Sequence, residues 1–119
     1  MKLGINERFA ILEVLPPHAT KDKMATVHDL RMACSRTIEE DGQKNRWFAD
    51  QNGQVIVREE RDVEIHIDGG IAAIIVAELK ERDRTAMIFD RHLSLWAKFV
   101  DHEWTEPAPP SETEGETNA

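Results

Sequence analysis

One stretch, residues 63–100, carries most of the strong hydrophobic pattern of this 119-residue chain. It opens with VEIHID, in which apolar and polar residues alternate as in a strand with one buried face. Gly69-Gly70 then lead into an apolar run that predicts a helix from Ile71, which the charged letters KERDR interrupt. MIF restores contact with the core, and Asp90 is expected to cap a last helix. The predicted apolar stripe of that helix is Leu93, Trp96, Phe99 and Val100.

The N-terminal part predicts two helices that cover this core. Asn6 is expected to cap the first helix, and Pro16-Pro17 to end it. Its predicted stripe is Ile5, Phe9, Leu12 and Leu15. Thr20 is expected to cap the second helix, which the EEDG sequence at 39–42 should break. Its stripe is Met24, Val27, Leu30, Cys34 and Ile38.

The middle of the chain predicts strands. RWFAD and QVIVRE flank Asn52-Gly53, a pair that favours the positive φ angles of a tight hairpin turn. With the strand at 63–67, this gives a small antiparallel sheet of two or three strands. We therefore expect an α+β fold: two N-terminal helices, the sheet and two C-terminal helices in one compact domain at 1–104. Residues 105–119, rich in Pro, Glu and Thr, are expected to form a disordered acidic tail.

The composition argues against several classes of partner. The net charge of −8 opposes a phosphate-neutralising surface and adsorption to anionic membranes. No apolar run approaches the roughly 18 residues of a membrane span, and MKLGINERF has no signal-peptide core. A single cysteine, Cys34, excludes an intrachain disulfide and a Cys-rich metal site. We expect a protein of the host cytoplasm or a virion-associated one.

The chain shows no motif that requires catalysis. Its five histidines form no His-x-x-x-His or His-Glu-x-x-His pattern, and Gly69-Gly70 lacks the context of a phosphate-binding loop. Glu64, His66 and Asp68 share one face of the predicted strand, which is conceivable for a metal but more typical of a solvated strand face. We predict no catalytic residue, cofactor or metal ligand. Candidate interface residues are Trp104, His66, Glu64 and Asp68.

GINERFAILEVLP near the start and IHIDGGIAAIIVAELKERDRTAMIFDRHLSLWAKFV near the end resemble a family of small phage and prophage proteins. The shared pattern is an Asn-Glu-Arg-led helix that ends at proline, an Ile-x-Ile strand, an Ile-Ile helix and a Leu-rich helix that ends in Lys-Phe-Val. The resemblance covers about half of the chain and departs from the pattern at Gly69-Gly70 and Arg82. It implies a viral or prophage origin and no assigned activity or functional residue.

We therefore expect a non-enzymatic, acidic, phage-type protein that acts through protein–protein contacts with a phage or host partner. It would be an assembly or accessory component, or a host-factor binder. The alternatives are a nucleic-acid mimic that inhibits a host enzyme, a small metal-binding or enzymatic module, and direct DNA binding, the last disfavoured by charge. A homodimer is left open by the sequence.

Overall fold

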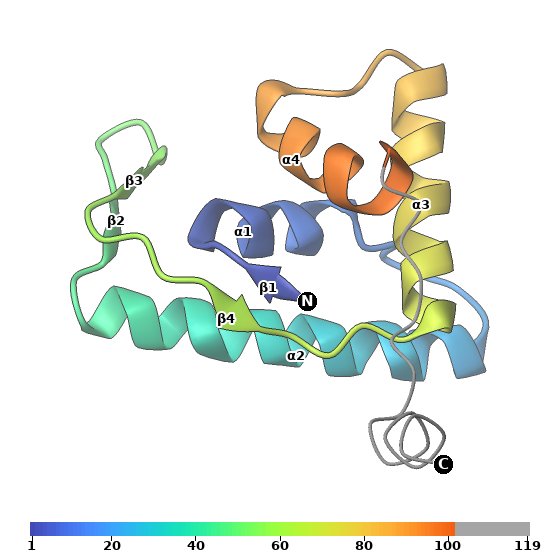
Figure 1. Cartoon of the computed structure of the whole chain (residues 1–119), viewed down its shortest axis with the longest axis horizontal. Helices are drawn as coiled ribbons and strands as arrows, with labels where there is room; N and C mark the ends of the chain where they lie inside the picture. Colours follow the sequence, from blue (N-terminus) through green and yellow to red (C-terminus); the bar gives the residue numbers. More distant parts are fainter. Residues whose placement is uncertain (102–119) are drawn as a thin grey trace, which may run out of the picture.

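The computed structural model describes residues 1–101, and the fold is mixed α+β, as predicted (Figure 1). In chain order the elements are β1 (Lys2–Leu3), α1 (Ile5–Val14), α2 (Lys21–Gln43), β2 (Trp47–Ala49), β3 (Val55–Val57), β4 (Val63–Glu64), α3 (Gly69–Arg84), the 3-10 turn η1 (Asp90–His92), α4 (Leu93–Trp96) and the π-helical turn η2 (Ala97–Asp101). The predicted tail at 105–119 lies outside the described residues.

The strands form two separate antiparallel pairs, which corrects the expected single sheet. β2 and β3 make the predicted hairpin, with Phe48 opposite Ile56. β4 pairs instead with β1, where Leu3 lies opposite Val63. Strand β1 has no signal in the sequence, because two residues before a helix are too few to show alternation. The first helix therefore follows a strand.

The N-cap of helix α1 lies two residues earlier than predicted. Gly4, not Asn6, is the N-cap, and its N–H donates to the Glu7 carboxylate at 2.9 Å. The N–H of Ile5 donates to the Glu60 carboxylate at 2.8 Å. The helix ends at Val14, before the prolines, as predicted. Its buried side is Ile5, Arg8, Ala10, Ile11 and Val14.

Helix α2 begins as predicted and continues where a break was expected. Thr20 is the N-cap, and its hydroxyl accepts the N–H of Lys23. The helix runs on to Gln43 because Asp41 is buried in an ion cluster and Gly42 lies under the Trp47 indole. A Cβ at position 42 would sit 3.2 Å from that ring. Tertiary contacts thus override the weak helix propensity of the EEDG sequence.

The hairpin turn differs from the predicted tight turn. Of the pair at 52–53 only Gly53 has a positive φ, at 78°. The Asp50 carboxylate accepts the N–H groups of Asn52 and Gln54, each at 2.8 Å, and closes a longer loop. After the hairpin, Ile65 and Ile67 are buried while Glu64 and His66 are exposed, which confirms the predicted alternation.

The C-terminal elements differ from the prediction in their bounds, caps and buried residues. Asp68 caps α3, accepting the N–H of Ile71 at 2.8 Å, and the helix includes KERDR before it ends at Arg84. Met87 and Phe89 are 48% and 44% exposed, so the expected return to the core at MIF is wrong for both. Asp90 does not cap a helix; the N-cap of η1 is Phe89. Phe99 is buried, as predicted. Leu93 is exposed and Trp96 is only half-buried, and His92 and Leu95, each one position earlier, are buried instead.

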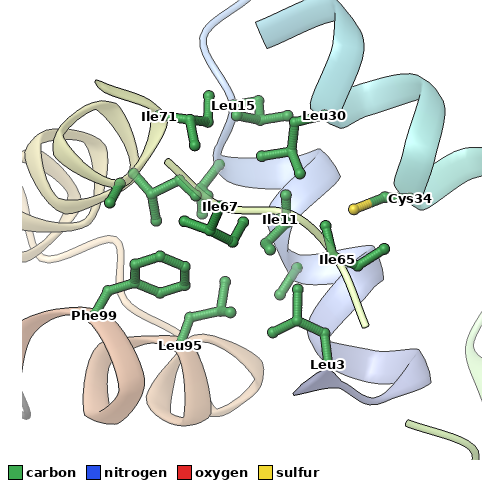
Figure 2. Close-up of a cluster of buried hydrophobic side chains, with 14 of the residues drawn as sticks. Leu3, Ile11, Leu15, Leu30, Cys34, Ile65, Ile67, Ile71, Leu95 and Phe99 are labelled. Atoms are coloured by element: carbon green, nitrogen blue, oxygen red, sulfur yellow. The ribbon is translucent and has the colours of Figure 1, made fainter. Parts of the chain in front are cut away.

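One core joins these elements (Figure 2). Ile67 lies between Phe99 of η2 and Ile11 of α1, and Leu30 and Cys34 close the core from α2. Cys34 is fully buried, as expected, and burial raises the pKa of its thiol to about 11. The hairpin lies outside this core at one end of α2 (Figure 1). The segment between α3 and α4 lies on the side of α1 that faces away from α2 (Figure 1).

Candidate functional site

A groove of about 660 Å³ crosses the outer side of α1 between the hairpin and the segment that enters η1. We call it the α1 groove. Its lining residues are Asn6, Phe9, Ala10 and Glu13 on the floor, Gln54 and Val55 on the hairpin wall, and Phe89, Asp90 and Arg91 on the opposite wall. Phe9, Val55 and Phe89 make it partly apolar, and it holds charges of both signs.

Exposed apolar side chains concentrate on the two segments that flank this groove. Six large hydrophobic residues are exposed among residues 1–101. Five of them belong to the hairpin or to the 87–93 segment, namely Phe48, Ile56, Met87, Phe89 and Leu93. The sixth, Met32, lies on α2. Of these five, Phe89 lines the groove, whereas Phe48 and Ile56 lie on the hairpin face opposite to Val55. An exposed aromatic ring beside a partly apolar groove is typical of an interaction surface.

The hairpin wall is fixed to the body of the protein by Trp47. Its ring meets that of Phe9 edge to face, with centroids 5.1 Å apart. Its indole N–H donates to the carbonyl of Ile38 at 2.8 Å. These contacts join β2 to α1 and α2, because an aromatic pair and a satisfied indole both favour one orientation. The floor and the hairpin wall therefore share one rigid support.

A buried ion cluster also holds the base of the hairpin. The Asp41 carboxylate is fully buried and lies 2.8 Å from Arg8 Nη1, 3.1 Å from Arg46 Nη1 and 2.6 Å from Arg61 Nε. Burial alone would raise the pKa of Asp41, but the hydrogen bonds and charges of Arg8 and Arg61 outweigh it and lower the pKa. Arg8 also donates to the carbonyls of Leu3, Gly4 and Arg61. The cluster joins α1, α2 and both ends of the hairpin.

The opposite wall is attached to α1 through Glu13. Arg91 Nε lies 2.9 and 3.0 Å from the two carboxylate oxygens of Glu13. His92, fully buried, contacts the same carboxylate through Nε2. Its Nδ1 accepts the N–H of Phe89 at 3.0 Å, so the ring proton is on Nε2 and is donated to Glu13. Arg91, with His92, lowers the pKa of Glu13 to about 2 against the opposing effect of burial.

A second carboxylate of α1 holds α4 and η2. Glu7 accepts from Lys98 Nζ at 2.8 Å and from the Ser94 hydroxyl. Burial raises the pKa of Glu7, but Lys98, Ser94 and the N–H of Gly4 together lower it. Lys98 pairs with the same carboxylate, so the lowered pKa of Glu7 keeps it an ionised acceptor that holds Ser94 in place. The polar groups around the groove position its walls.

The structure separates the residues that the sequence proposed for an interface. Glu64 pairs with the Met1 ammonium at 2.9 Å. His66 and Asp68 line a cleft of about 170 Å³ beside Asp29 of α2, but the Asp68 carboxylate is occupied as the cap of α3. Within residues 1–101 no group of three His, Cys, Asp or Glu side chains is placed to hold a metal ion. Trp104 lies outside the described residues.

Sequence reasoning missed the polar residues that build the site. Arg8 follows Ile5 by three and precedes Ile11 by three, so helical spacing alone puts it on the buried side. His92 precedes Leu95 by three and Phe99 by seven, which gives the same signal. Residue type gives the opposite expectation, because charged and polar side chains are mostly exposed. Their carboxylate partners are distant in sequence and left no local signal.

A second cavity of about 550 Å³ lies between the α1–α2 loop and α3. It is lined mainly by small apolar side chains, and none of the six large exposed hydrophobic residues borders it. We therefore take the α1 groove as the candidate site.

No family model, no curated protein and no solved structure matches this chain. In the part of the chain that the structure describes, no helix is both long and apolar enough to cross a membrane.

Proposed function

We propose that this chain is a non-enzymatic protein of the small phage type that binds a protein partner, of phage or host, in the α1 groove. The observation that carries the proposal is that Phe89, one of the six exposed large hydrophobic side chains of residues 1–101, lines the groove together with Phe9 and Val55. The resemblance to small phage and prophage proteins supports a role as an assembly component or host-factor binder.

The chemistry of the groove suits a protein partner. Protein interfaces are enriched in aromatic residues, Met and Arg, with polar groups at the rim. Phe9 and Phe89 line the groove, and Arg91, which is half exposed, stacks over Phe89 at 4.3 Å. The walls are held by buried ion pairs and hydrogen bonds, so binding would cost little ordering of the groove.

The charge distribution gives no support to a nucleic-acid mimic. Residues 1–101 contain 15 basic and 18 acidic side chains, so five of the eight excess negative charges lie in 102–119. Several acids of the described part, Glu7, Glu13 and Asp41 among them, are paired with basic groups of the same chain. A mimic needs a continuous face of unpaired acids. We therefore do not advance it as a second function.

The proposal is tested by affinity capture of the full chain from lysates of uninfected and phage-infected cells. A Phe89→Ser variant is compared with Met32→Ser, which removes another exposed apolar side chain, from α2, and leaves the groove intact. We expect one partner to be captured by the wild type and by Met32→Ser and lost with Phe89→Ser. Capture that is the same for all three chains contradicts the groove as the binding site.

A further inference from the structure

The outer edge of β3 carries backbone groups without a partner among residues 1–101. Arg58 N–H donates to Arg46 at 2.7 Å and Asp50 N–H to Gln54 at 2.9 Å, so these positions face each other through hydrogen bonds. In an antiparallel pair such positions alternate with non-bonded ones. The N–H and C=O groups of Val55 and Val57 therefore point away from β2. No other described backbone group bonds to them.

This edge borders the α1 groove. Gln54 and Val55 form the hairpin wall, and Phe89–Arg91 face them across α1. A strand added to β3 would lie about 4.8 Å from it. It would satisfy the free N–H and C=O groups of Val55 and Val57, which an α-helix in the same place would leave unpaired because its own groups bond internally. The groove is therefore suited to an extended chain.

The charges of the groove indicate which charged side chain the bound segment carries. The groove has three ionisable side chains, Glu13, Asp90 and Arg91. Glu13 and Arg91 neutralise each other in a paired contact. Asp90 is exposed and has no basic partner within residues 1–101. The groove therefore presents one uncompensated negative charge, which a basic side chain of the bound segment would complement.

We infer that the α1 groove binds an extended segment of its protein partner as a third strand on β3. Alternate side chains of the segment are apolar and face Phe9, Val55 and Phe89, and one Lys or Arg lies against Asp90. The added strand extends a two-stranded hairpin, which is marginal by itself. The inference rests on the proposed function, because it names how the partner is held in that groove.

The test uses a displayed library of random short peptides, selected on the full chain, with binders kept when Phe89→Ser removes their binding. Each binder is then measured on Val57→Pro and on the matched variant Ala49→Pro. Both substitutions remove an N–H that points away from the hairpin, the first on β3 and the second on β2. Val57→Pro should weaken binding about tenfold, whereas Ala49→Pro should leave it within about twofold.

N-methylation of the peptide gives a second measurement that needs no change in the protein. We expect binding to fall at every second residue, the period of a strand. The selected sequences should carry Lys or Arg, and Asp90→Asn should weaken them by about threefold. These variants are compared only where circular dichroism shows an unchanged fold; if Val57→Pro unfolds, the N-methyl pattern decides.

Two outcomes overturn the inference in distinguishable ways. Equal effects of Val57→Pro and Ala49→Pro, or N-methyl effects without a period of two, refute strand addition but leave a groove whose binders depend on Phe89. Failure to select any binder that depends on Phe89 refutes the groove itself, and with it the proposed function.

Discussion

At the scale of single residues, the unusual feature is an arginine inside the apolar stripe of α1. Arg8 is fully buried, and its guanidinium reaches Asp41 at 2.8 Å and three backbone carbonyls. A buried charge is tolerated when it is paired and hydrogen-bonded. Asp41 contacts three arginines at once. Arg46 and Arg61 have further carboxylate partners in Glu59 and Glu40, so within residues 1–101 it is buried Arg8 that depends on Asp41 alone.

We predict that Asp41→Ala lowers the free energy of unfolding by about 3–5 kcal/mol, because it leaves buried Arg8 without its counter-ion. Urea unfolding followed by circular dichroism measures the loss. The matched control is Glu39→Ala on the same helix, an exposed acid, which should change stability by less than about 0.5 kcal/mol. A loss below about 1 kcal/mol for Asp41→Ala would show that the cluster does not stabilise the fold.

The pH dependence of this cluster has a defined sign. The pKa of Asp41 is lowered in the folded protein, so the unfolded chain binds the proton more readily. Its stabilising contribution is therefore complete above the ordinary aspartate pKa of about 3.9 and is lost as the pH falls through the folded value. In Asp41→Ala, the acid-induced loss of stability should be smaller than in the wild type.

At the scale of elements, two carboxylates of α1 hold the C-terminal segments. Glu13 binds Arg91 and His92 of η1, and Glu7 binds Ser94 of α4 and Lys98 of η2. The wall of the groove that contains Phe89 has little apolar burial of its own, since Met87 and Phe89 are both exposed. Its position therefore depends on the contacts of Glu13 more than on packing.

We predict that Glu13→Gln loosens the 86–92 segment without unfolding the protein. Amide hydrogen exchange should rise at Phe89, whose N–H is held by His92, and should stay unchanged at the α3 core position Ile75. Glu81→Gln, which removes an exposed carboxylate paired only with Arg84 of its own helix, is the control. Unchanged exchange at Phe89 would show that packing alone orders the segment.

Acid should have the same effect as this substitution. The pKa of Glu13 lies at about 2 in the folded protein, below its ordinary value of 4.5. The contribution of Glu13 is thus complete above pH 4.5 and is lost as the pH falls toward about 2. Because the side chain is about one third exposed, solvent screening makes this contribution modest.

Elements with strong local periodicity could be predicted, and those fixed by distant contacts could not. The alternation at 63–67, the cap of α2 and the stop before Pro16 follow from local sequence. The last turns have two overlapping apolar registers, one through Leu93 and Trp96 and one through Leu95 and Phe99. In the second register, which is the buried one, His92 contacts Glu13, a partner 79 residues away. Spacing alone is compatible with both registers and does not choose between them.

At the scale of the whole molecule, the α+β class could be predicted but the strand pairing could not. The β1–β4 pair joins the start of the chain to its middle, and the ammonium of Met1 also donates to Ile65 at 2.9 Å. Short strands of two residues carry too little pattern to choose partners. The same limit applies to the α1 groove, because its three parts are separated by about 40 residues each and meet only after folding.

Within residues 1–101, the buried hydrophobic core extends from Leu3 to Phe99. We predict that a chain ending at Trp104, without the 105–119 segment expected to be disordered, has a free energy of unfolding within about 0.5 kcal/mol of the full chain. Urea unfolding of the two chains at equal concentration measures the difference. A loss greater than about 1 kcal/mol would mean that residues 105–119 pack on the domain, and the predicted boundary at 104 would be wrong.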